Sequence, residues 1–192
     1  LDLDSTAQLA RLTLRDNDCS FGSIVHGQFS GGALYANSAK AFIADVLVAD
    51  NVANHGAGVA LFGSEKSRFE DSVFERNLGI EWGGNVLAEE QSLTEFHRVR
   101  FSYGTSPYGG HLDDGTIAAP LFKYCILEYG SSSGPGSTYY GYGKSSTRFE
   151  NVVAQNGFTP SSASVYLNYG VLPQFSNAIF FHNCPTTHSD SG

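Results

Sequence analysis

The chain has 192 residues, of which 41% are hydrophobic and 16% are charged, and its formal net charge is −8. This length suits one domain, or one segment of a longer passenger protein. The negative charge argues against nucleic acids and anionic membrane surfaces as partners, because both attract basic patches. No apolar run is long enough to form a transmembrane segment.

In chain order, residues 1–11, of which Leu1 to Gln8 form a polar stretch, read as a lead-in to a single β domain spanning 1–192. Leu12 and Leu14 begin the first repeat, the repeats occupy residues 12–183, and residues 184–192 form a polar tail. A longer insertion, from Asp18 to Ser30, follows the first repeat. We expect it to fold over that end of the domain, because an uncovered strand edge recruits other chains.

Three residue columns recur along the chain. The first is phenylalanine, at intervals of 26 or 27 residues: Phe42, Phe69, Phe96, Phe122, Phe149 and Phe175. The second is glycine, at intervals of 26: Gly32, Gly58, Gly84, Gly110 and Gly136. The third contains only asparagine or glycine: Asn51, Asn77, Gly104, Gly130, Asn156 and Asn183. A fixed period of this length indicates a solenoid. The Phe column predicts an internal ladder, and the third column predicts a tight corner in the left-handed conformation, which Asn and Gly adopt at low cost.

Apolar residues within each repeat alternate, as at Val46 and Val48 or at Val99 and Phe101. A period of two indicates strands and not helices. Short strands separated by Gly, Asn and Ser corners predict a parallel β-helix, in which each strand pairs with its counterpart one turn further on, roughly 4.8 Å away. The column spacing predicts about seven rungs with ~26 residues per rung.

Two motifs resemble a known kind of repeat. Gly31-Gly32-Ala33-Leu34 and Phe74-Glu75-Arg76-Asn77 are similar to the paired GGA(I/L) and FxxN motifs of chlamydial-type polymorphic outer-membrane proteins. The chain as a whole resembles right-handed parallel β-helix proteins of the pectate-lyase-like superfamily. The resemblance implies an all-β, right-handed parallel β-helix. These motifs occupy corners and ladder positions, so they indicate a fold and not an activity.

Positions that follow the Gly column are apolar on both faces of the predicted strand over the first three repeats. Tyr35, Leu61 and Leu87 occupy equivalent places there. A strand that is apolar on both faces is normally covered on both, and an exposed apolar patch usually marks an interaction site. These three residues are therefore a possible interface for self-association or for a neighbouring surface protein.

The cysteine count is three, which is odd. Cys125 replaces Val99 of the preceding repeat and is expected to be a small buried residue. Cys19 and Cys184 lie just past the corner of the first and last repeats. In a rigid solenoid these two would be too far apart for an intramolecular disulfide, which needs Cα atoms within about 7 Å. They could pair only between molecules stacked end to end; two unpaired thiols are the alternative.

The best candidate for a catalytic cluster is formed by His111, Asp113 and Asp114, with Glu89 and Glu90 one repeat earlier. His111 and Asp113 are two residues apart on a predicted strand and should share a face, where they could pair or bind a cation. Paired carboxylates suit glycoside hydrolysis and clustered ones suit Ca²⁺. The alternative is ordinary turn chemistry for Asp-Asp-Gly. The further His, Arg and Lys residues of the resembled enzymes have no counterparts here, so we expect no catalytic residues, metal or cofactor, with Ca²⁺ as the one possible ligand.

Aromatic residues suggest one other site. Tyr139, Tyr140 and Tyr142 could form an exposed cluster that contacts a sugar or a protein, or could pack onto the neighbouring turn. Trp82 and His97 are expected to be surface features.

Together these observations favour a non-enzymatic, extracellular or cell-surface structural module: a subunit of a fibre, or an adhesin-like passenger that self-associates end to end. Two alternatives remain open. One is a polysaccharide lyase or glycoside hydrolase of the β-helix type, and the other is a carbohydrate-binding module with a glycan as its partner.

Overall fold

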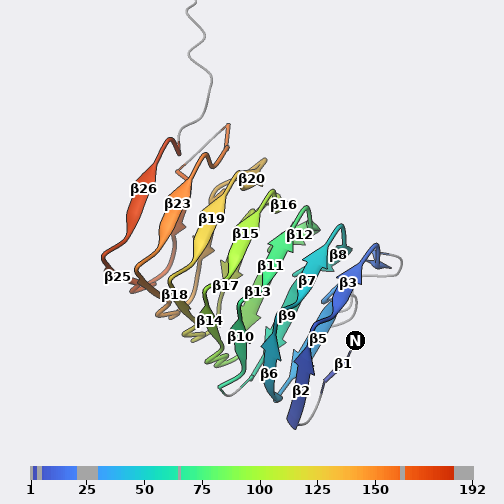
Figure 1. The fold of residues 1–192 in the computed structure, drawn as a ribbon. Coiled ribbons are helices and arrows are strands. Elements are labelled where there is room, and N and C mark those ends of the chain that lie inside the picture. The colour runs from blue at the N-terminus through green and yellow to red at the C-terminus, as the bar shows by residue number, and fades with distance from the viewer. Residues whose placement is uncertain (1, 4–5, 21–29, 65, 161–162, 184–192) are drawn as a thin grey trace, which may run out of the picture.

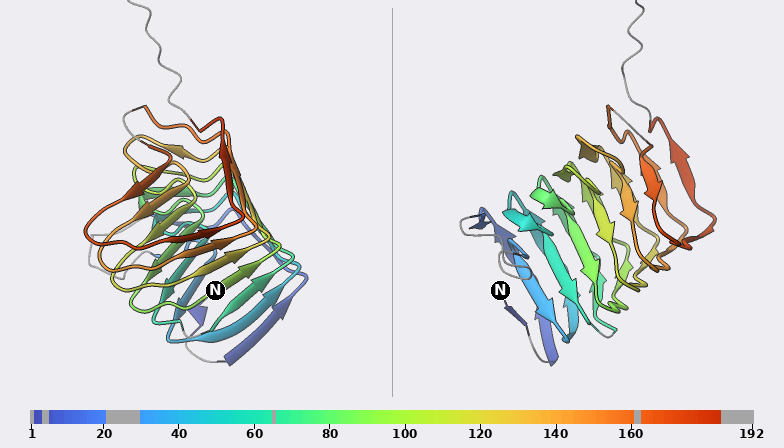
Figure 2. Two further views of the ribbon diagram at one scale, coloured as in Figure 1. Left: turned by 90° about the vertical axis from the view of Figure 1, so that its left-hand side faces the viewer. Right: turned by 180° about the vertical axis from the view of Figure 1, so that it is seen from behind.

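The computed structural model describes residues 2–3, 6–20, 30–64, 66–160 and 163–183. They form an all-β, parallel solenoid of about six turns with ~26 residues per turn, which confirms the predicted fold class (Figure 1). The turns are stacked along one axis, and Figure 2 shows each turn lying directly on the one before it. No helix among the described residues is long and apolar enough to span a membrane.

Four parallel sheets run along the solenoid, and three of them have seven strands. Sheet A contains β1 (Asp2–Leu3), β5 (Leu34–Asn37), β9 (Val59–Phe62), β13 (Val86–Glu89), β17 (Leu112–Asp114), β21 (Tyr139–Gly141) and β24 (Val165–Leu167). Sheet B contains β2 (Thr6–Ala10), β6 (Lys40–Ala44), β10 (Arg68–Glu70), β14 (Glu95–His97), β18 (Leu121–Lys123), β22 (Arg148–Glu150) and β25 (Gln174–Ser176). Sheet C contains β3 (Thr13–Arg15), β7 (Leu47–Ala49), β11 (Val73–Glu75), β15 (Arg100–Ser102), β19 (Ile126–Glu128), β23 (Val153–Gln155) and β26 (Ile179–Phe181). The shorter sheet D has five strands: β4 (Asp18–Cys19), β8 (Val52–His55), β12 (Leu78–Trp82), β16 (Thr105–Ser106) and β20 (Ser131–Ser132).

Each turn passes through the sheets in the order A, B, C, D, and every strand except the last described one of each sheet pairs with its counterpart in the next turn. The residues expected to be a lead-in already belong to this pattern, because β2 pairs with β6 along its full length. Of the insertion expected to cover the first turn, residues 21–29 lie outside the described residues, as does the polar tail 184–192.

A phenylalanine ladder fills the core beneath sheet B. Phe69, Phe96, Phe122, Phe149 and Phe175 are in register from strand to strand. Successive rings stack with centroids 5.1, 4.8, 5.3 and 5.1 Å apart. Stacked aromatic rings contribute beyond their buried area, so the repeat period of the sequence is stabilised directly by ring contacts between turns.

Phe42 was predicted to be the first member of this ladder, and that prediction is wrong. Phe69 pairs with Ile43, which is buried, whereas Phe42 lies opposite Arg68 and is 42% exposed. The register of β6 is therefore offset by one residue from the Phe column. In a strand, an offset of one residue moves a side chain to the other face.

The corners between sheets C and D also differ from the prediction. The left-handed residue is the one before the Asn or Gly column at most turns, as at Asp50, Arg76, Tyr103 and Tyr129. Asn156 alone in the predicted column has a positive φ itself, and at Asn183 the left-handed residue is His182. The Asn and Gly residues of this column are therefore not explained by a need for the left-handed backbone conformation.

Asn51 and Asn77 of this column, together with Asn17 one turn earlier and Asn85 at the next corner, instead form a hydrogen-bonded ladder that is buried from Asn51 onward. Asn17 Nδ2 donates to Asn51 Oδ1 across 2.7 Å, and Asn51 Nδ2 donates to Asn77 Oδ1 across 2.9 Å. Asn77 Nδ2 then donates to Asn85 Oδ1 across 2.8 Å and to the carbonyl of Val48 across 3.0 Å. Since buried polar groups must be paired, each Asn depends on the turns above and below it.

The change from Asn to Gly at Gly104 and Gly130 has a packing reason. A Cβ on Gly104 would lie 2.4 Å from the carbonyl oxygen of Gly110 and 2.8 Å from His111 Nδ1. A Cβ on Gly130 would lie 2.2 Å from the carbonyl oxygen of Ser137 and 2.9 Å from His111 Nε2. Backbone carbonyl oxygens therefore come closest, and the imidazole of His111 lies next to them.

Candidate functional site

His111 lies inside the solenoid and not on its surface. Its Nδ1 is 2.8 Å from Asn85 Nδ2, and its Nε2 is 3.0 Å from the carbonyl oxygen of Glu128. Because a carbonyl oxygen only accepts, Nε2 carries the proton and Nδ1 accepts from the amide. Burial lowers the pKa of His111 to about 4. The ring is therefore neutral near pH 7.

Asp114 also points into the core, in register with Ala88 of the previous turn. Its carboxylate accepts hydrogen bonds from the hydroxyl of Tyr139 at 2.9 and 3.0 Å, from Ser145 Oγ at 2.9 Å, and from Thr147 Oγ1. Burial raises the pKa of Asp114 to about 7, although these donors act in the opposite direction. Through these hydrogen bonds, Asp114 links its own turn to the following one.

Asp113 occupies the opposite face of the same strand. It is in register between Leu87 and Tyr140, and it is fully buried. Neither carboxylate oxygen has a hydrogen-bond partner among the described residues. Burial first, and then the negative charges of Asp114 and Glu89, raise the pKa of Asp113 well above its usual range. Such a group is costly to bury in its ionised form.

The prediction that His111 and Asp113 share a face is wrong. Strand β17 begins at Leu112, so His111 belongs to the preceding corner and two-residue alternation does not apply across it. His111, Asp113 and Asp114 have separate surroundings and do not assemble into one catalytic cluster. Within the described part of the chain, no group of three or more His, Cys, Asp or Glu side chains is arranged to hold a metal ion. Binding of Ca²⁺ stays a prediction.

A second apolar cluster covers the outer face of sheet A. It consists of Ala60, Phe62 and Leu87, with Tyr35 and Trp82 packed against it. Register explains the alignment, because Tyr35 pairs with Ala60 and Ala60 pairs with Leu87. Tyr35 and Leu87 therefore lie on the outer face.

Leu61 does not belong to this outer cluster. It pairs with Ala36 and Ala88 and packs in the main core. The chain between Gly58 and β9 is one residue shorter than the equivalent segment in the neighbouring turns, so counting from the Gly column assigned Leu61 to the wrong face. Leu61 is thus buried inside, and its predicted interface role is wrong.

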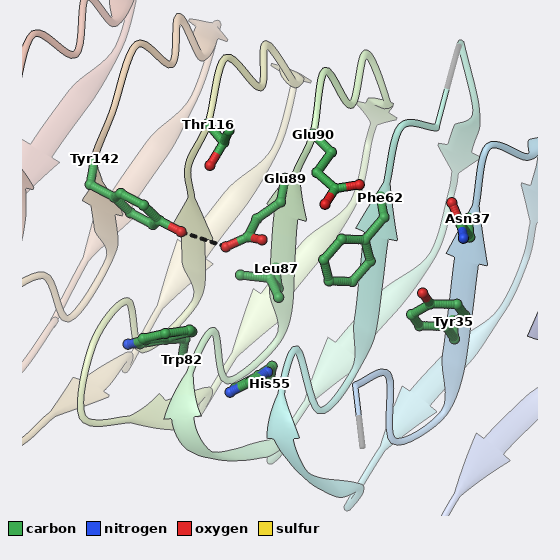
Figure 3. Close-up of a pocket in the computed structure, with 10 residues that line it drawn as sticks. All are labelled: Tyr35, Asn37, His55, Phe62, Trp82, Leu87, Glu89, Glu90, Thr116 and Tyr142. Carbon is green, nitrogen blue, oxygen red and sulfur yellow. Dashed lines mark hydrogen bonds between the residues drawn. The ribbon is translucent and has the colours of Figure 1, made fainter. Parts of the chain in front are cut away.

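A cavity of about 490 Å³ opens on this outer face. Its lining comprises Tyr35, Asn37, His55, Phe62, Trp82, Leu87, Glu89, Glu90, Thr116 and Tyr142. Figure 3 shows Tyr35, Phe62, Leu87 and Glu89 projecting from adjacent strands of sheet A, with His55 and Trp82 at one edge. A concave site with aromatic walls and a few polar groups is the usual form of a ligand-binding site.

One wall of the cavity is built from the ends of sheet D strands. His55, at the end of β8, stacks on Trp82, at the end of β12, with ring centroids 4.8 Å apart and planes at 19°. Nε2 of His55 lies 3.1 Å from Glu81 Oε2, and Nδ1 lies 3.4 Å from Ser30 Oγ. These contacts fix the orientation of His55, and stacking against it holds the indole of Trp82 in place.

The other wall carries carboxylates. Tyr142 donates its hydroxyl proton to Glu89 Oε1 across 2.5 Å (Figure 3). Burial, together with this contact, raises the pKa of Tyr142, so the phenol stays neutral. Glu90 is exposed at the corner that follows β13, and a neighbouring hollow shares Glu90 and Thr116 with the cavity. Among the described residues, no Lys or Arg lines the cavity.

Further aromatic rings continue along the same side of the solenoid. Tyr140 stacks on Tyr166 of the next turn with centroids 5.5 Å apart and planes at 3°. Tyr108 and Tyr142 lie 5.3 and 6.2 Å from Tyr140, centroid to centroid. The aromatic surface therefore extends beyond the cavity and over later turns. We refer to the cavity and these rings together as the aromatic face.

The predicted Tyr139–Tyr142 cluster is divided between the core and this face. Tyr139 is fully buried and packs against Phe149, whereas Tyr140 and Tyr142 are half-buried on the outside. Trp82 was expected to be an isolated surface residue, and His55 and Phe62 were not predicted as site residues. Tyr35, Phe62 and Glu89 belong to successive strands of sheet A, but only the true register shows that they share a face.

Cys19 and Cys125, the two cysteines among the described residues, are both free thiols. Cys125 is buried, as its place in the repeat predicts, and its thiol donates to the carbonyl of Phe96. Burial raises the pKa of Cys125 to about 12. Cys19 is a free, partly exposed thiol in β4. Cys184 lies outside the described residues, so an intermolecular disulfide stays a prediction.

The last turn leaves apolar side chains uncovered. Among the described residues, Phe175 stacks on Phe149 yet is 45% exposed, and Phe180 of β26, in register with the buried Ala154, is 37% exposed. Phe180 faces the same open end and, with Phe175 and Val165, lines a hollow of about 450 Å³. An apolar surface of this kind is typical of an interface.

Comparison of the chain with protein-family models, with curated proteins and with solved structures found no match.

Proposed function

We propose that the chain is an extracellular glycan-binding module that holds its ligand on the aromatic face. The observation that carries this proposal is the cavity in which Tyr35, Phe62 and Trp82 stand next to Glu89. Sugar rings have apolar C–H faces and hydroxyl edges. Flat aromatic side chains offer large, rigid apolar surface for the former, and ionised carboxylates are acceptors for the latter.

The arrangement along the solenoid supports a polymeric ligand. Tyr140 and Tyr166 stack in consecutive turns, on the same side as the cavity. Adjacent strands are roughly 4.8 Å apart, so side chains in register form a regular row. A linear polysaccharide lying along the row would contact several turns at once, which raises the overall affinity of weak individual contacts.

The test is direct binding of a panel of neutral, amino and acidic oligosaccharides by calorimetry. Trp82→Ala is expected to weaken binding by about tenfold or more, because Trp side chains that a ligand covers are typical hot spots. Tyr124→Ala is the matched control, since Tyr124 is exposed and does not line the cavity. Unchanged melting temperatures verify that both variants are folded. The absence of binding to every oligosaccharide rejects the proposal.

A second function, end-to-end association into a fibre, is favoured by the uncovered last turn. Strands β24, β25 and β26 have the same order as in every inner turn, and each lacks a neighbour on one side among the described residues. A second molecule could add its first strands to these edges, and such a head-to-tail contact forms an open filament if the rotation does not close.

Sedimentation velocity over a range of protein concentrations tests the association. We expect the mass to grow with concentration, and Phe180→Lys to keep the chain monomeric, because inward-pointing charges block edge pairing. Ile126→Lys is the control, as Ile126 is an exposed residue in the middle of sheet C. A wild-type chain that stays monomeric at all concentrations excludes this function.

Kinship with the pectate-lyase-like superfamily, and with repeats of polymorphic outer-membrane proteins, remains our proposal. It is supported by the solenoid fold and by the positions of its motifs. Gly31 has a positive φ at the corner before β5, and Phe74 is buried in the core. Extracellular localisation is proposed on the same basis.

A further inference from the structure

We propose that the cavity on the outer face of sheet A selects glycans that carry protonated amines, such as polymers of glucosamine, over neutral and acidic glycans. This inference rests on the proposed glycan-binding function and adds the chemical class of the ligand. It is drawn from the charges of the lining residues and from the partners that these residues have.

The carboxylates at the cavity are not compensated by a positive side chain. No ion pair joins Glu89 or Glu90 to a Lys or Arg in the part of the chain that the structure describes. The hydrogen-bond partner of Glu89 is the neutral hydroxyl of Tyr142. Several acidic residues elsewhere on the solenoid do pair with an Arg, as Asp71 does with Arg98 and Asp50 with Arg76. The cavity therefore has negative charge that a ligand can satisfy.

The one lining residue that can become positive is already engaged. His55 stacks on Trp82, and its Nε2 lies 3.1 Å from Glu81 Oε2. The imidazole of His55 is thereby paired with Glu81, and no Lys or Arg is among the described residues that line the cavity with Glu89 and Glu90. Uronate or sulfate groups would consequently meet carboxylates with no cation to bind them, and like charges in close contact oppose binding at an interface.

The aromatic walls favour the same ligand. An ammonium group within about 6 Å of the face of a Trp, Tyr or Phe ring is attracted by the ring quadrupole. Phe62, Trp82 and Tyr142 line the same cavity as Glu89 and Glu90. An amino sugar has an apolar ring face for stacking and an ammonium group for a carboxylate, so it can use both kinds of lining residue at once.

The partial burial of Glu89 strengthens the attraction between its carboxylate and an ammonium group of the ligand. Glu89 is intermediate in exposure, and its negative charge adds to burial and to the charge of Asp114 in raising the pKa of Asp113. Screening by salt is weaker for partly buried charges than for exposed ones. An ammonium–carboxylate contact here contributes more than a surface ion pair would.

The experiment compares oligomers of glucosamine, N-acetylglucosamine and galacturonate, all of equal length, by calorimetry at mildly acidic pH, where the amines are protonated. We expect the glucosamine oligomer to bind about tenfold tighter than the acetylated one, which is the value of one charge-assisted hydrogen bond. We expect no binding of the galacturonate oligomer.

Two variants locate the effect. Glu89→Gln is expected to weaken binding of the glucosamine oligomer by about tenfold and to leave the acetylated oligomer nearly unchanged. Glu95→Gln is the matched control, because Glu95 is a partly exposed carboxylate on β14, in sheet B. Its effect on both ligands is expected to be within twofold, as is usual for surface changes of about 0.5 kcal/mol or less.

The outcomes separate the two proposals. Equal affinity for amino and acetylated oligomers, or tight binding of galacturonate, overturns the selectivity and leaves glycan binding in place. The absence of binding to all three ligands overturns glycan binding and the selectivity together. If a lysine oligomer binds as tightly as the glucosamine oligomer, and Trp82→Ala weakens neither, charge alone attracts the ligand and the amino-sugar assignment is wrong.

Discussion

Asn85 Nδ2 lies 2.8 Å from His111 Nδ1 inside the solenoid, and the two residues come from consecutive turns. The amide can only donate at this nitrogen, so the imidazole must accept there and cannot be doubly protonated without losing the contact. A pair of side chains that the sequence places 26 residues apart thus fixes both a tautomer and a charge state.

The first prediction concerns pH. The pKa of His111 is about 4 in the folded chain, against 6.5 for an unperturbed His. Below pH 6.5 the unfolded chain binds a proton that the folded chain does not, so stability is complete above that pH and falls as the pH drops toward 4. The loss reaches about 3 kcal/mol. NMR titration of the wild-type protein should show the His111 ring neutral above about pH 5, and a ring that titrates near 6.5 contradicts the assignment.

A variant provides the stability readout for the same prediction. In His111→Asn the fall in unfolding free energy between pH 6.5 and 4 should be smaller than in the wild type. His97→Asn is the control, because His97 lies in sheet B beside Glu95, outside the buried ladder.

The second prediction contrasts two adjacent carboxylates. Asp113→Leu should raise the unfolding free energy at pH 7 by about 1–3 kcal/mol, since it removes an unpartnered buried acid and matches Leu87 in register. Asp114→Leu should lower it, because Tyr139, Ser145 and Thr147 would lose their acceptor. Urea denaturation measures both. A loss of stability in both variants would show that Asp113 has a partner in solution.

The stabilisation by Asp113→Leu should also depend on pH. The pKa of Asp113 is raised in the folded chain, so the folded chain holds this proton more tightly than the unfolded chain. The wild type therefore loses stability as the pH rises above about 4, the usual pKa of Asp. The advantage of the Leu variant should be small near pH 4 and grow toward neutral pH.

The third prediction compares a phenylalanine that lies in the core ladder with Phe42, which belongs to the Phe column of the sequence but lies outside the core. Phe96 is fully buried between Phe69 and Phe122, so Phe96→Ala should cost about 3–5 kcal/mol. Phe42→Ala should cost less than about 1 kcal/mol, because that ring is on the outside. Chemical denaturation measures the unfolding free energy of the two variants. Equal losses would show that the side chain of Phe42 is also packed in the core.

The fourth prediction tests the asparagine ladder. Asn77 accepts from the backbone and side-chain nitrogens of Asn51, and donates to Asn85 and to the carbonyl of Val48. Asn77→Ala leaves several buried groups unpaired, so we expect a loss of about 2–5 kcal/mol. Asn37→Ala, at an exposed position in β5, should change stability by less than about 0.5 kcal/mol. Thermal denaturation of both variants measures the difference.

The fold could be predicted from the sequence because the turns are nearly equal in length. Residues such as Phe69, Phe96 and Phe122 recur at the period of the solenoid, and their register follows directly. Faces were predicted wrongly where the register differs by one residue from the counted columns, at Phe42 and at Leu61, and where a strand begins later than expected, at His111. A shift of one residue does not change the repeat period noticeably, yet it moves every side chain of a strand to the opposite face of the sheet.

The site could not be predicted in the same way. His55 and Trp82 stack because two strands of sheet D end at the same edge, and Tyr142 reaches Glu89 across 53 residues of sequence. None of these four residues occupies a repeated column. The buried carboxylates are equally irregular, since Asp113 and Asp114 are neighbours whose opposite surroundings follow from where β17 begins.

Every turn between Phe69 and Phe149 takes 26 or 27 residues and presents the same cross-section to both of its neighbours. Such a chain can grow or shrink in whole units by duplication or deletion within its gene, because each new junction repeats a ring-on-ring contact that already exists. Each added unit would also extend sheet A by one strand. The length of polymer that the outer surface can hold would then be set by the number of copies and not by any change of amino acid.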